Sequence, residues 1–317
     1  MSVVFDLAIS GLLLGCLISM SAVGLTLLAR IHGFFNVAHG ILFTLGAYLS
    51  LRFLNLLPDW GTFPTFSFGP ALILAMFLSM LATGAVALIS YVLYYKPLLN
   101  RGLTPPFLTL SSLGLMFILR SVVYLSWGSR VRYYSWNVPT RIPLPFGLGL
   151  LSDDLFIIAF AIVLLIGVQI FLRRTGLGKR LRATTEAKTL ASVSGIKFRN
   201  MVSLTWILAG VLSAAAGTLY GITVHVKPLM GWDFLLALFA AIVIGGVGSL
   251  RGAIAGAIIV GFVQEVGAGF LQNLFFSMGI RVQMYSYKLA IVFTVVILVL
   301  LTRPEGLRTV FWGRSDR

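Results

Sequence analysis

The chain has 317 residues, of which 59% are hydrophobic and 10% are charged. Its mean hydropathy of +1.00 lies far outside the range of soluble domains. The net charge of +15 does not indicate nucleic-acid binding, because most basic residues lie in short loops beside apolar runs, where membrane topology explains them. The single cysteine, Cys16, excludes an intrachain disulfide.

Nine apolar runs approach or reach the length of about 20 residues that crosses a bilayer. They are continuously apolar rather than alternating, and in lipid only helices or closed barrels satisfy the backbone hydrogen bonds. The composition therefore predicts an all-α integral membrane protein, a polytopic helical bundle of about 8–10 transmembrane helices. The whole chain, residues 1–317, is expected to form a single transmembrane domain. The expected helices cover residues 5–28, 37–54, 70–95, 106–127, 155–172, 201–226, 234–250, 253–276 and 283–301.

The loop at residues 173–200 is the most basic segment and sets the orientation of the chain. It holds eight Lys or Arg and a single acid, Glu186. Short basic loops between spans lie on the cytoplasmic side, so the N-terminus is expected outside and the C-terminus in the cytoplasm. The eight basic residues are Arg173, Arg174, Lys179, Arg180, Arg182, Lys188, Lys197 and Arg199.

Two segments leave the number of spans open. The loop at residues 128–152 has three arginines on the expected outer face, and its prolines and aromatic residues suggest a folded cap at the interface. The glycines of residues 244–257 permit either a tight inner turn between two spans or a re-entrant pair buried in protein. Residues 33–48 and 236–252 are both glycine-interrupted apolar segments that follow a span, which makes the two halves candidates for an internal repeat.

Residue chemistry argues against catalysis. The histidines His32, His39 and His225 have no metal-site spacing, and the sequence shows neither a G-x-S-x-G elbow nor a Walker-type phosphate loop. Every aspartate is expected at a membrane edge or outside the spans. The chain is therefore not expected to be an enzyme, and any ATP hydrolysis would need other subunits.

Asn36, His39 and Gly40 form a polar start to the second apolar run. Polar groups at such depth are costly unless they pair or line a wet cavity. These residues are therefore candidates for a pathway or hinge element. The equally weighted alternative is that Asn36 caps the helix while His39 bonds a neighbouring carbonyl.

Glu265 lies inside the expected span at residues 253–276. A carboxylate within a span faces the bundle interior and marks either a pathway or a structural pair. Arg120 and Lys288 are its candidate partners, and a structural pair is favoured slightly over a substrate or proton relay. The remaining pathway or hinge candidates are Gly245, Gly246 and Gly248.

The basic loop also predicts a docking element. Residues 184–194 are expected to form a short helix that Gly195 ends in the left-handed conformation. Glu186 would then lie near the helix N-terminus, where its charge is favourable. One face is small and mildly apolar, which suits close approach by another protein, whereas a solvated loop would explain only the charges. This face consists of Ala187, Leu190, Ala191 and Ser194.

Five motifs occur in a fixed order along the chain. They are GLT at 24–26 with FNVAHG at 35–40 and LGAY at 45–48, then RA, EA and SGI within 182–196, the small-residue stretch 209–221, GGVGS at 245–249 with glycines at 252 and 256, and RPEGL at 303–307. Together they resemble the permease subunits of branched-chain amino acid ABC importers, the H-type partner of the high-affinity Leu/Ile/Val system. The order and spacing cover nearly the whole chain.

The resemblance implies that residues 173–200 are a cytoplasmic coupling loop, whose coupling helix sits in a cleft of an ATPase subunit. It places Arg182, Glu186, Ala187 and Gly195 at that interface. The "EAA" motif of sugar importers is not matched, because Lys188 follows Ala187, so the mode of ATPase contact is not carried over. The outer loops show no family pattern, which leaves the docking surface for a binding protein unassigned.

The resemblance further implies a permease that moves branched-chain or related amino acids across a bacterial or archaeal inner membrane. Expected partners are a second homologous permease subunit, two ABC ATPase subunits, an extracytoplasmic solute-binding protein and membrane lipid, with no nucleic acid. No cofactor or metal is expected in this chain, and ATP with Mg would bind the partner subunits. The alternatives are a permease for urea or short-chain amides and, in another class, a self-contained channel or secondary carrier.

Overall fold

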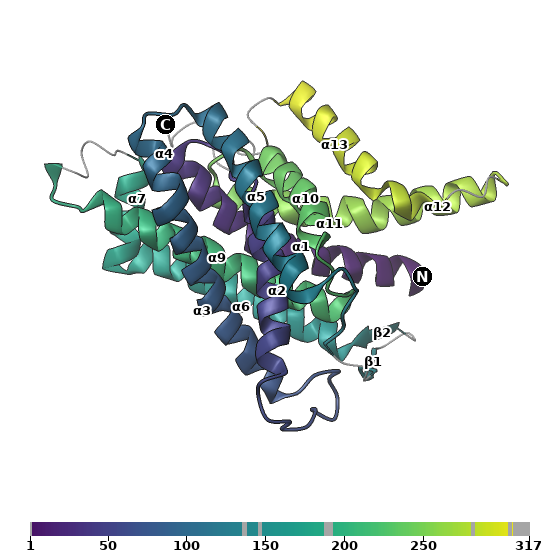
Figure 1. Cartoon of the computed structure of the whole chain (residues 1–317). Coiled ribbons are helices and arrows are strands. Elements are labelled where there is room, and N and C mark those ends of the chain that lie inside the picture. Colours follow the sequence, from purple (N-terminus) through teal and green to yellow (C-terminus); the bar gives the residue numbers. More distant parts are fainter. Residues whose placement is uncertain are drawn as a thin grey trace.

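A computed structural model describes residues 2–134, 138–144, 148–186, 193–279, 283–303 and 306. Helices make up almost all of its regular structure, which confirms the predicted all-α membrane bundle (Figure 1). The elements are α1 (Ser2–His32), α2 (His39–Leu54), α3 (Pro70–Ser90), the π-helix η1 (Tyr91–Tyr95), α4 (Lys96–Asn100), α5 (Pro105–Trp127), β1 (Arg141–Leu144), β2 (Leu148–Leu151), α6 (Ser152–Arg174), α7 (Gly176–Glu186), α9 (Phe198–Thr223), α10 (Met230–Gly245), α11 (Leu250–Phe262), the π-helix η3 (Val263–Gly267), α12 (Ala268–Ser277), the 3-10 helix η4 (Met284–Tyr287) and α13 (Lys288–Thr302).

Each of the nine predicted apolar helices is found among the described residues, with shifted ends. Seven helical stretches in this part of the chain are long and apolar enough to cross a membrane. The other two, α2 and α10, have 16 residues each. That length gives about 24 Å of helix against a hydrocarbon core of about 30 Å. The predicted helices at 70–95 and 253–276 each contain a π-helical turn, a feature that hydropathy does not reveal.

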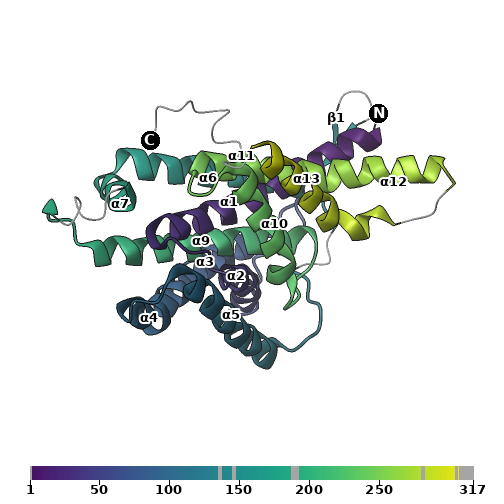
Figure 2. The ribbon, with the colours of Figure 1, turned by 90° about the horizontal axis from the view of Figure 1, so that it is seen from above.

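Helix α1 lies at the centre of the bundle. Its most apolar window is 89% buried, whereas that of α13 is 11% buried. Figure 2 shows α1 running between α11 and α9, which both pack against it. The peripheral helices α3, α6 and α13 instead expose aliphatic side chains, as lipid contact requires.

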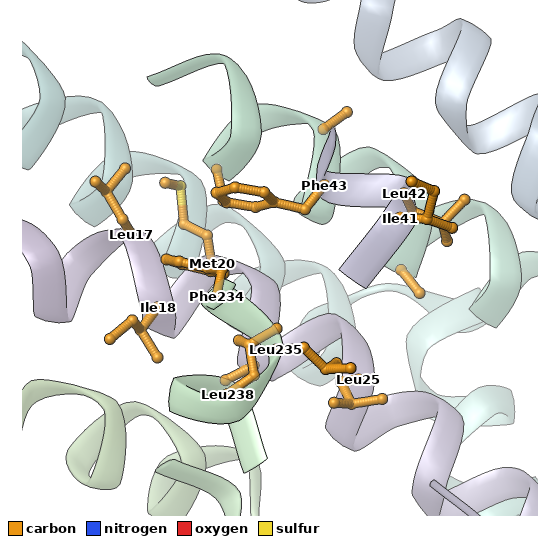
Figure 3. Packing of buried hydrophobic residues seen from close by; sticks show 14 of the residues in the cluster. Leu17, Ile18, Met20, Leu25, Ile41, Leu42, Phe43, Phe234, Leu235 and Leu238 are labelled. Carbon is orange, nitrogen blue, oxygen red and sulfur yellow. The ribbon is translucent and has the colours of Figure 1, made fainter. Parts of the chain in front are cut away.

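The apolar core is densest where α1, α2 and α10 meet (Figure 3). There the ring of Phe43 on α2 stacks on that of Phe234 on α10, with centroids 4.1 Å apart. Leu17 and Met20 of α1 lie beside this pair and are fully buried. The two short helices α2 and α10 are therefore held in the bundle by side-chain packing, since neither is long enough to span the hydrocarbon core.

The two short helices begin inside the bundle. Helix α1 runs antiparallel to α9, since Trp206 bonds His32 at one end and Ser213 bonds Ser21 further along. Ser21, which also bonds the first residue of α2, lies 11 residues before the end of α1, a distance of about 16 Å. Helix α10 starts beside the first turns of α2, because the N–H of Gly231 donates to Thr44 Oγ1 at 3.0 Å. The structure thus pairs α2 with α10. Helix α10 starts six residues before residues 236–252, the segment that was the candidate counterpart of residues 33–48 in an internal repeat.

A small hairpin lies between α5 and α6 in the chain and contacts the loop between α2 and α3. Strands β1 and β2 form an antiparallel hairpin in which Arg141 pairs with Leu151. The carboxylate of Asp153, just beyond the hairpin, accepts hydrogen bonds from the N–H and hydroxyl of Ser67. This hairpin confirms the folded cap expected within residues 128–152, although its strands had no periodic signal in the sequence.

Candidate functional site

Asn36 lies in the non-helical segment between α1 and α2 and stabilises it through its side chain. Its side-chain oxygen accepts hydrogen bonds from the hydroxyl of Tyr95 at 2.7 Å and from the N–H of Ala38 at 3.1 Å. Ser112 Oγ accepts the N–H of Val37 at 2.9 Å. Ala38, and not Asn36, precedes the first residue of α2. The capping alternative for Asn36 is found in the turn that leads into α2, since its side-chain oxygen accepts the N–H two residues further on, as that of an N-cap residue does.

His39 is fully buried and ties three helices together. Its Nε2 lies 3.0 Å from the carbonyl oxygen of Ser21 and 3.1 Å from that residue's hydroxyl. The same hydroxyl lies 3.3 Å from Ser213 Oγ on α9. The alternative that His39 bonds a neighbouring carbonyl is confirmed. The amide of Asn36 and this imidazole do not share a helix face, since Asn36 lies outside α2.

Gly40 marks the closest approach of α2 and α10. A Cβ built on Gly40 would lie 2.6 Å from the carbonyl oxygen of Gly231, and one built on Gly231 would overlap the carbonyl oxygen of Gly40. Only glycine at both positions allows the two helix starts to cross so closely. Gly40 is thus a close-packing position, and its role in a pathway or hinge stays a prediction. Its counterpart Gly231 has no distinguishing local signal in the sequence.

The glycine-rich segment after α10 forms a tight turn, which joins α11 to a helix shorter than a span. The choice between a turn joining two spans and a re-entrant pair stays a prediction. Helix α10 ends at Gly245, and Gly246 and Gly248 follow with φ of 90° and 83°. Ser249 Oγ then caps α11 by accepting the N–H of Gly252 at 3.1 Å. Gly252 lies directly against Gly245, so the turn folds α11 back onto α10.

Glu265 forms an ion pair with Lys288. The Nζ to Oε1 distance is 2.6 Å, and the side chains are 16% and 27% exposed respectively. Lys288 also lies 4.8 Å from the ring centroid of Tyr285. The structural pair favoured from the sequence is therefore found, with Lys288 rather than Arg120 as the partner. Because Glu265 lies within η3, the pair joins a π-helical turn to the start of α13.

Removing only the cation of this pair is expected to destabilise the protein more than removing both charges. Lys288→Met leaves the Glu265 carboxylate largely buried without a partner, at an expected cost of about 2 kcal/mol. Adding Glu265→Gln should recover part of that loss. Thermal unfolding of the detergent-solubilised protein measures both effects. A double variant as unstable as the sum of the two single variants would show that the pair carries no coupling.

The basic loop differs from its prediction in where its first helix starts. Helix α7 begins at Gly176, because Thr175 Oγ1 caps it by accepting the N–H of Gly178 at 3.0 Å. The described part of α7 ends at Glu186, so this residue lies ten residues after the helix start rather than near its N-terminus as expected. Arg182 is exposed on α7.

The end of the predicted short helix is partly described. Gly195 adopts φ of 74°, which confirms the expected left-handed conformation. Ala187, Leu190 and Ala191 of the small face lie outside the described residues. The proposed docking face therefore stays a prediction.

The seven long apolar stretches in the described part of the chain, packed with two helices that start inside the bundle, define a multi-pass membrane protein. Residues 7–301 match the family described as branched-chain amino acid transport system / permease component, and the chain belongs to that family. It is 29% identical to the high-affinity branched-chain amino acid transport system permease protein BraD of Pseudomonas aeruginosa, over 94% of each chain. It is 27% identical to LivH of Escherichia coli K12 over 94% of this chain and 93% of that protein. It is 28% identical to a probable LivH of Methanocaldococcus jannaschii over 95% and 91%.

One solved structure also resembles the chain. It is titled PsaBC from Streptococcus pneumoniae in complex with Fab, with 15% identity, a TM-score of 0.45 and coverage of 95% of this chain and 93% of that one. A likeness of this degree adds nothing to the family assignment.

Proposed function

We propose that this chain is the permease subunit of an ATP-binding cassette importer for branched-chain or related amino acids. The observation that carries the proposal is the family match over residues 7–301, together with relatives of that named function over 94% of the chain. The membrane is the inner membrane of a bacterial or archaeal cell, with the C-terminus in the cytoplasm. ATP and Mg bind partner subunits, and this chain needs no cofactor.

The partners are a second homologous permease, two ATPases and an extracytoplasmic binding protein. The substrate path runs between the two permeases, and closure of the ATPase dimer moves the coupling loops. Packing at the inner end of the bundle supports such transmission. Leu181 of α7 is 1% exposed and belongs to a buried cluster with Val23 of α1, Leu172 of α6 and Met201 of α9. A displacement of α7 would therefore act on three spanning helices.

The orientation predicts which loops are accessible from outside the cell. In a Cys16→Ala background, Lys197→Cys is expected to resist a membrane-impermeant thiol reagent in intact cells, whereas Asp59→Cys should react. Both positions are exposed in the structure, so the contrast reports sidedness rather than burial. Labelling of position 197 in intact cells would reverse the topology derived from the basic loop.

Uptake in cells tests the proposed substrate class. A host without its own branched-chain uptake systems would express the chain with its partner subunits, and entry of labelled leucine would be measured. We expect uptake that isoleucine and valine compete for, and that is lost when the ATPase phosphate-loop lysine is replaced. Transport of urea or short-chain amides in place of leucine would move the chain to that alternative. Uptake that persists with inactive ATPases would support a channel or carrier.

A further inference from the structure

A hollow of about 280 Å³ lies at the outer end of the bundle, beside the hairpin of β1 and β2. Figure 1 shows this hairpin and the loop between α2 and α3 at the same end of the molecule. The volume far exceeds the ~10–15 Å³ that one water molecule needs, so the hollow can admit the end of a long side chain. We call it the acidic hollow, and the residues that line it include Ser67, Phe68, Tyr133, Tyr134, Asp153 and Asp154.

Two adjacent carboxylates line the acidic hollow without a cation. Asp153 is 5% exposed and Asp154 is partly buried, and neither belongs to the ion pairs found among the described residues. The N–H and hydroxyl of Ser67 donate to the carboxylate of Asp153, and both acids lie in the first turn of α6, where the helix dipole favours negative charge. These neutral donors hold the carboxylates in place but supply no counter-charge. Because like charges in a largely buried site are costly, the hollow suits a cation.

The walls of the acidic hollow are fixed by hydrogen bonds. The N–H of Thr140 donates to the carbonyl of Thr65 at 3.1 Å, and the N–H of Ser152 donates to the carbonyl of Thr140 at 3.1 Å. Backbone hydrogen bonds in both directions, each of 2.9 Å, join Arg132 to Val226. The α2–α3 loop, the hairpin and α6 are thus tied to one another. The two carboxylates are therefore preorganised for a ligand rather than assembled by its arrival.

Aromatic rings lie beside the two carboxylates. Phe68, Tyr133 and Tyr134 all line the acidic hollow. Aromatic faces attract ammonium and guanidinium groups and pack along the aliphatic stems of lysine and arginine. A second hollow of about 250 Å³ shares Phe68 and Tyr134 with the first and is lined by the exposed Asp59. The acidic surface therefore extends over both hollows.

The lining favours a side chain of another protein over the transported amino acid or a metal ion. A zwitterionic amino acid would bring its own carboxylate next to Asp153 and Asp154, and no described Lys or Arg lines the hollow to receive it. A divalent cation prefers a larger set of anionic ligands, and no group of three or more His, Cys, Asp or Glu comes together in the described part of the chain. A lysine or arginine side chain brings positive charge alone.

We propose that the acidic hollow receives a lysine or arginine side chain of the extracytoplasmic binding protein. The cation pairs with Asp153 and Asp154, and the aliphatic stem packs on the rings beside them. The inference rests on the proposed importer function and assigns a docking surface for which the sequence shows no pattern. Because opposite charges steer association and are screened by salt, binding of the binding protein to the importer depends on salt concentration.

The affinity of the substrate-loaded binding protein for the assembled importer in lipid nanodiscs tests the pairing. Asp154→Asn keeps the shape of the side chain and is expected to weaken binding by about tenfold and to reduce its salt dependence, while Asp154→Lys should weaken it further. Asp6→Asn is the matched control, since Asp6 is an exposed acid on the same side of the membrane that does not line the hollow. It should leave the affinity unchanged. Unchanged affinity in Asp154→Asn would overturn the proposal.

An exchange of charges identifies the partner residue and separates pairing from a folding defect. Each exposed lysine and arginine of the binding protein is replaced in turn by glutamate and measured against the Asp154→Lys importer. One replacement is expected to restore most of the lost affinity, although the same variant binds the wild-type importer poorly. If no replacement restores binding, the carboxylates do not pair with the binding protein and the inference falls.

Other occupants of the acidic hollow would give different results. Normal affinity for the binding protein with lost leucine uptake in Asp154→Asn would assign the carboxylates to the ammonium group of the substrate. Loss of the second permease from purified Asp154→Asn complexes would assign them to that subunit. Weakening of wild-type binding by EDTA to the level of Asp154→Asn would assign them to a metal ion. Each of these results contradicts the proposal.

The two proposals fail in different ways. An importer that transports leucine at the expense of ATP, but whose affinity for the binding protein is the same in Asp154→Asn, retains the proposed function and refutes the docking site. A wild-type complex without ATP-driven leucine uptake refutes the proposed function itself.

Discussion

Gly231→Ala is expected to destabilise the folded protein strongly. A Cβ at this position would overlap the carbonyl oxygen of Gly40 and crowd Thr44 Oγ1. Both neighbours are buried, and Thr44 also accepts the N–H of Gly231. Because the two helix starts cannot separate without breaking the surrounding core, we expect a loss of about 3 kcal/mol or more. The yield and thermal midpoint of the detergent-solubilised protein measure the effect.

Gly167→Ala is the matched control for this substitution. Gly167 lies in α6, and no atom lies within 4 Å of a Cβ built on it. Alanine there should leave the thermal midpoint unchanged or raise it slightly, since alanine is the better helix former by up to about 1 kcal/mol. Equal behaviour of the two variants would mean that the crossing of α2 and α10 is not close in the protein.

Gly195→Leu is expected to uncouple ATP hydrolysis from transport while the protein still inserts. The residue has φ of 74° and no atom within 4 Å of an added Cβ. Leucine therefore meets no clash, but the left-handed conformation costs it about 1–2 kcal/mol, which favours a different path for the loop. In the reconstituted complex we expect uptake per ATP hydrolysed to fall by about tenfold, the ratio that 1.4 kcal/mol represents.

Gly176→Leu provides the comparison within the same loop. It too has no atom within 4 Å of an added Cβ, but its φ is not positive, and it starts α7. This variant should transport at close to the normal ratio. Unchanged coupling in Gly195→Leu, with normal ATPase stimulation, would remove this end of the loop from the mechanism.

Hydropathy was enough to predict the nine apolar helices, because lipid leaves the backbone few alternatives. Its start for α2, residue 37, lies two residues before the observed start at His39. Gly33, with φ of 73°, directly follows the end of α1 and is a local signal for the break. The hydrogen bond between Asn36 and Tyr95, which lie 59 residues apart, has no such local signature.

In the candidate site, too, local features could be predicted from the sequence, whereas features that depend on tertiary contacts could not. A carboxylate inside a span could be recognised as needing a partner, but the choice between Arg120 and Lys288 required the geometry of η3 and α13. The sequence does not predict the start of α7, because Thr175 followed by glycine favours a loop locally, whereas its Oγ1 caps the helix. Gly231 gave no signal, since its role depends on the proximity of Gly40.

The central claim, that this chain is one permease of an ATP-driven importer, is tested most directly by uptake into liposomes. Liposomes would contain the chain with its second permease and two ATPases, with the binding protein and labelled leucine outside. We predict uptake that requires ATP on the ATPase side and disappears when the ATPases are omitted. Leucine uptake without ATP into liposomes that hold this chain alone would contradict the assignment and identify a channel or carrier.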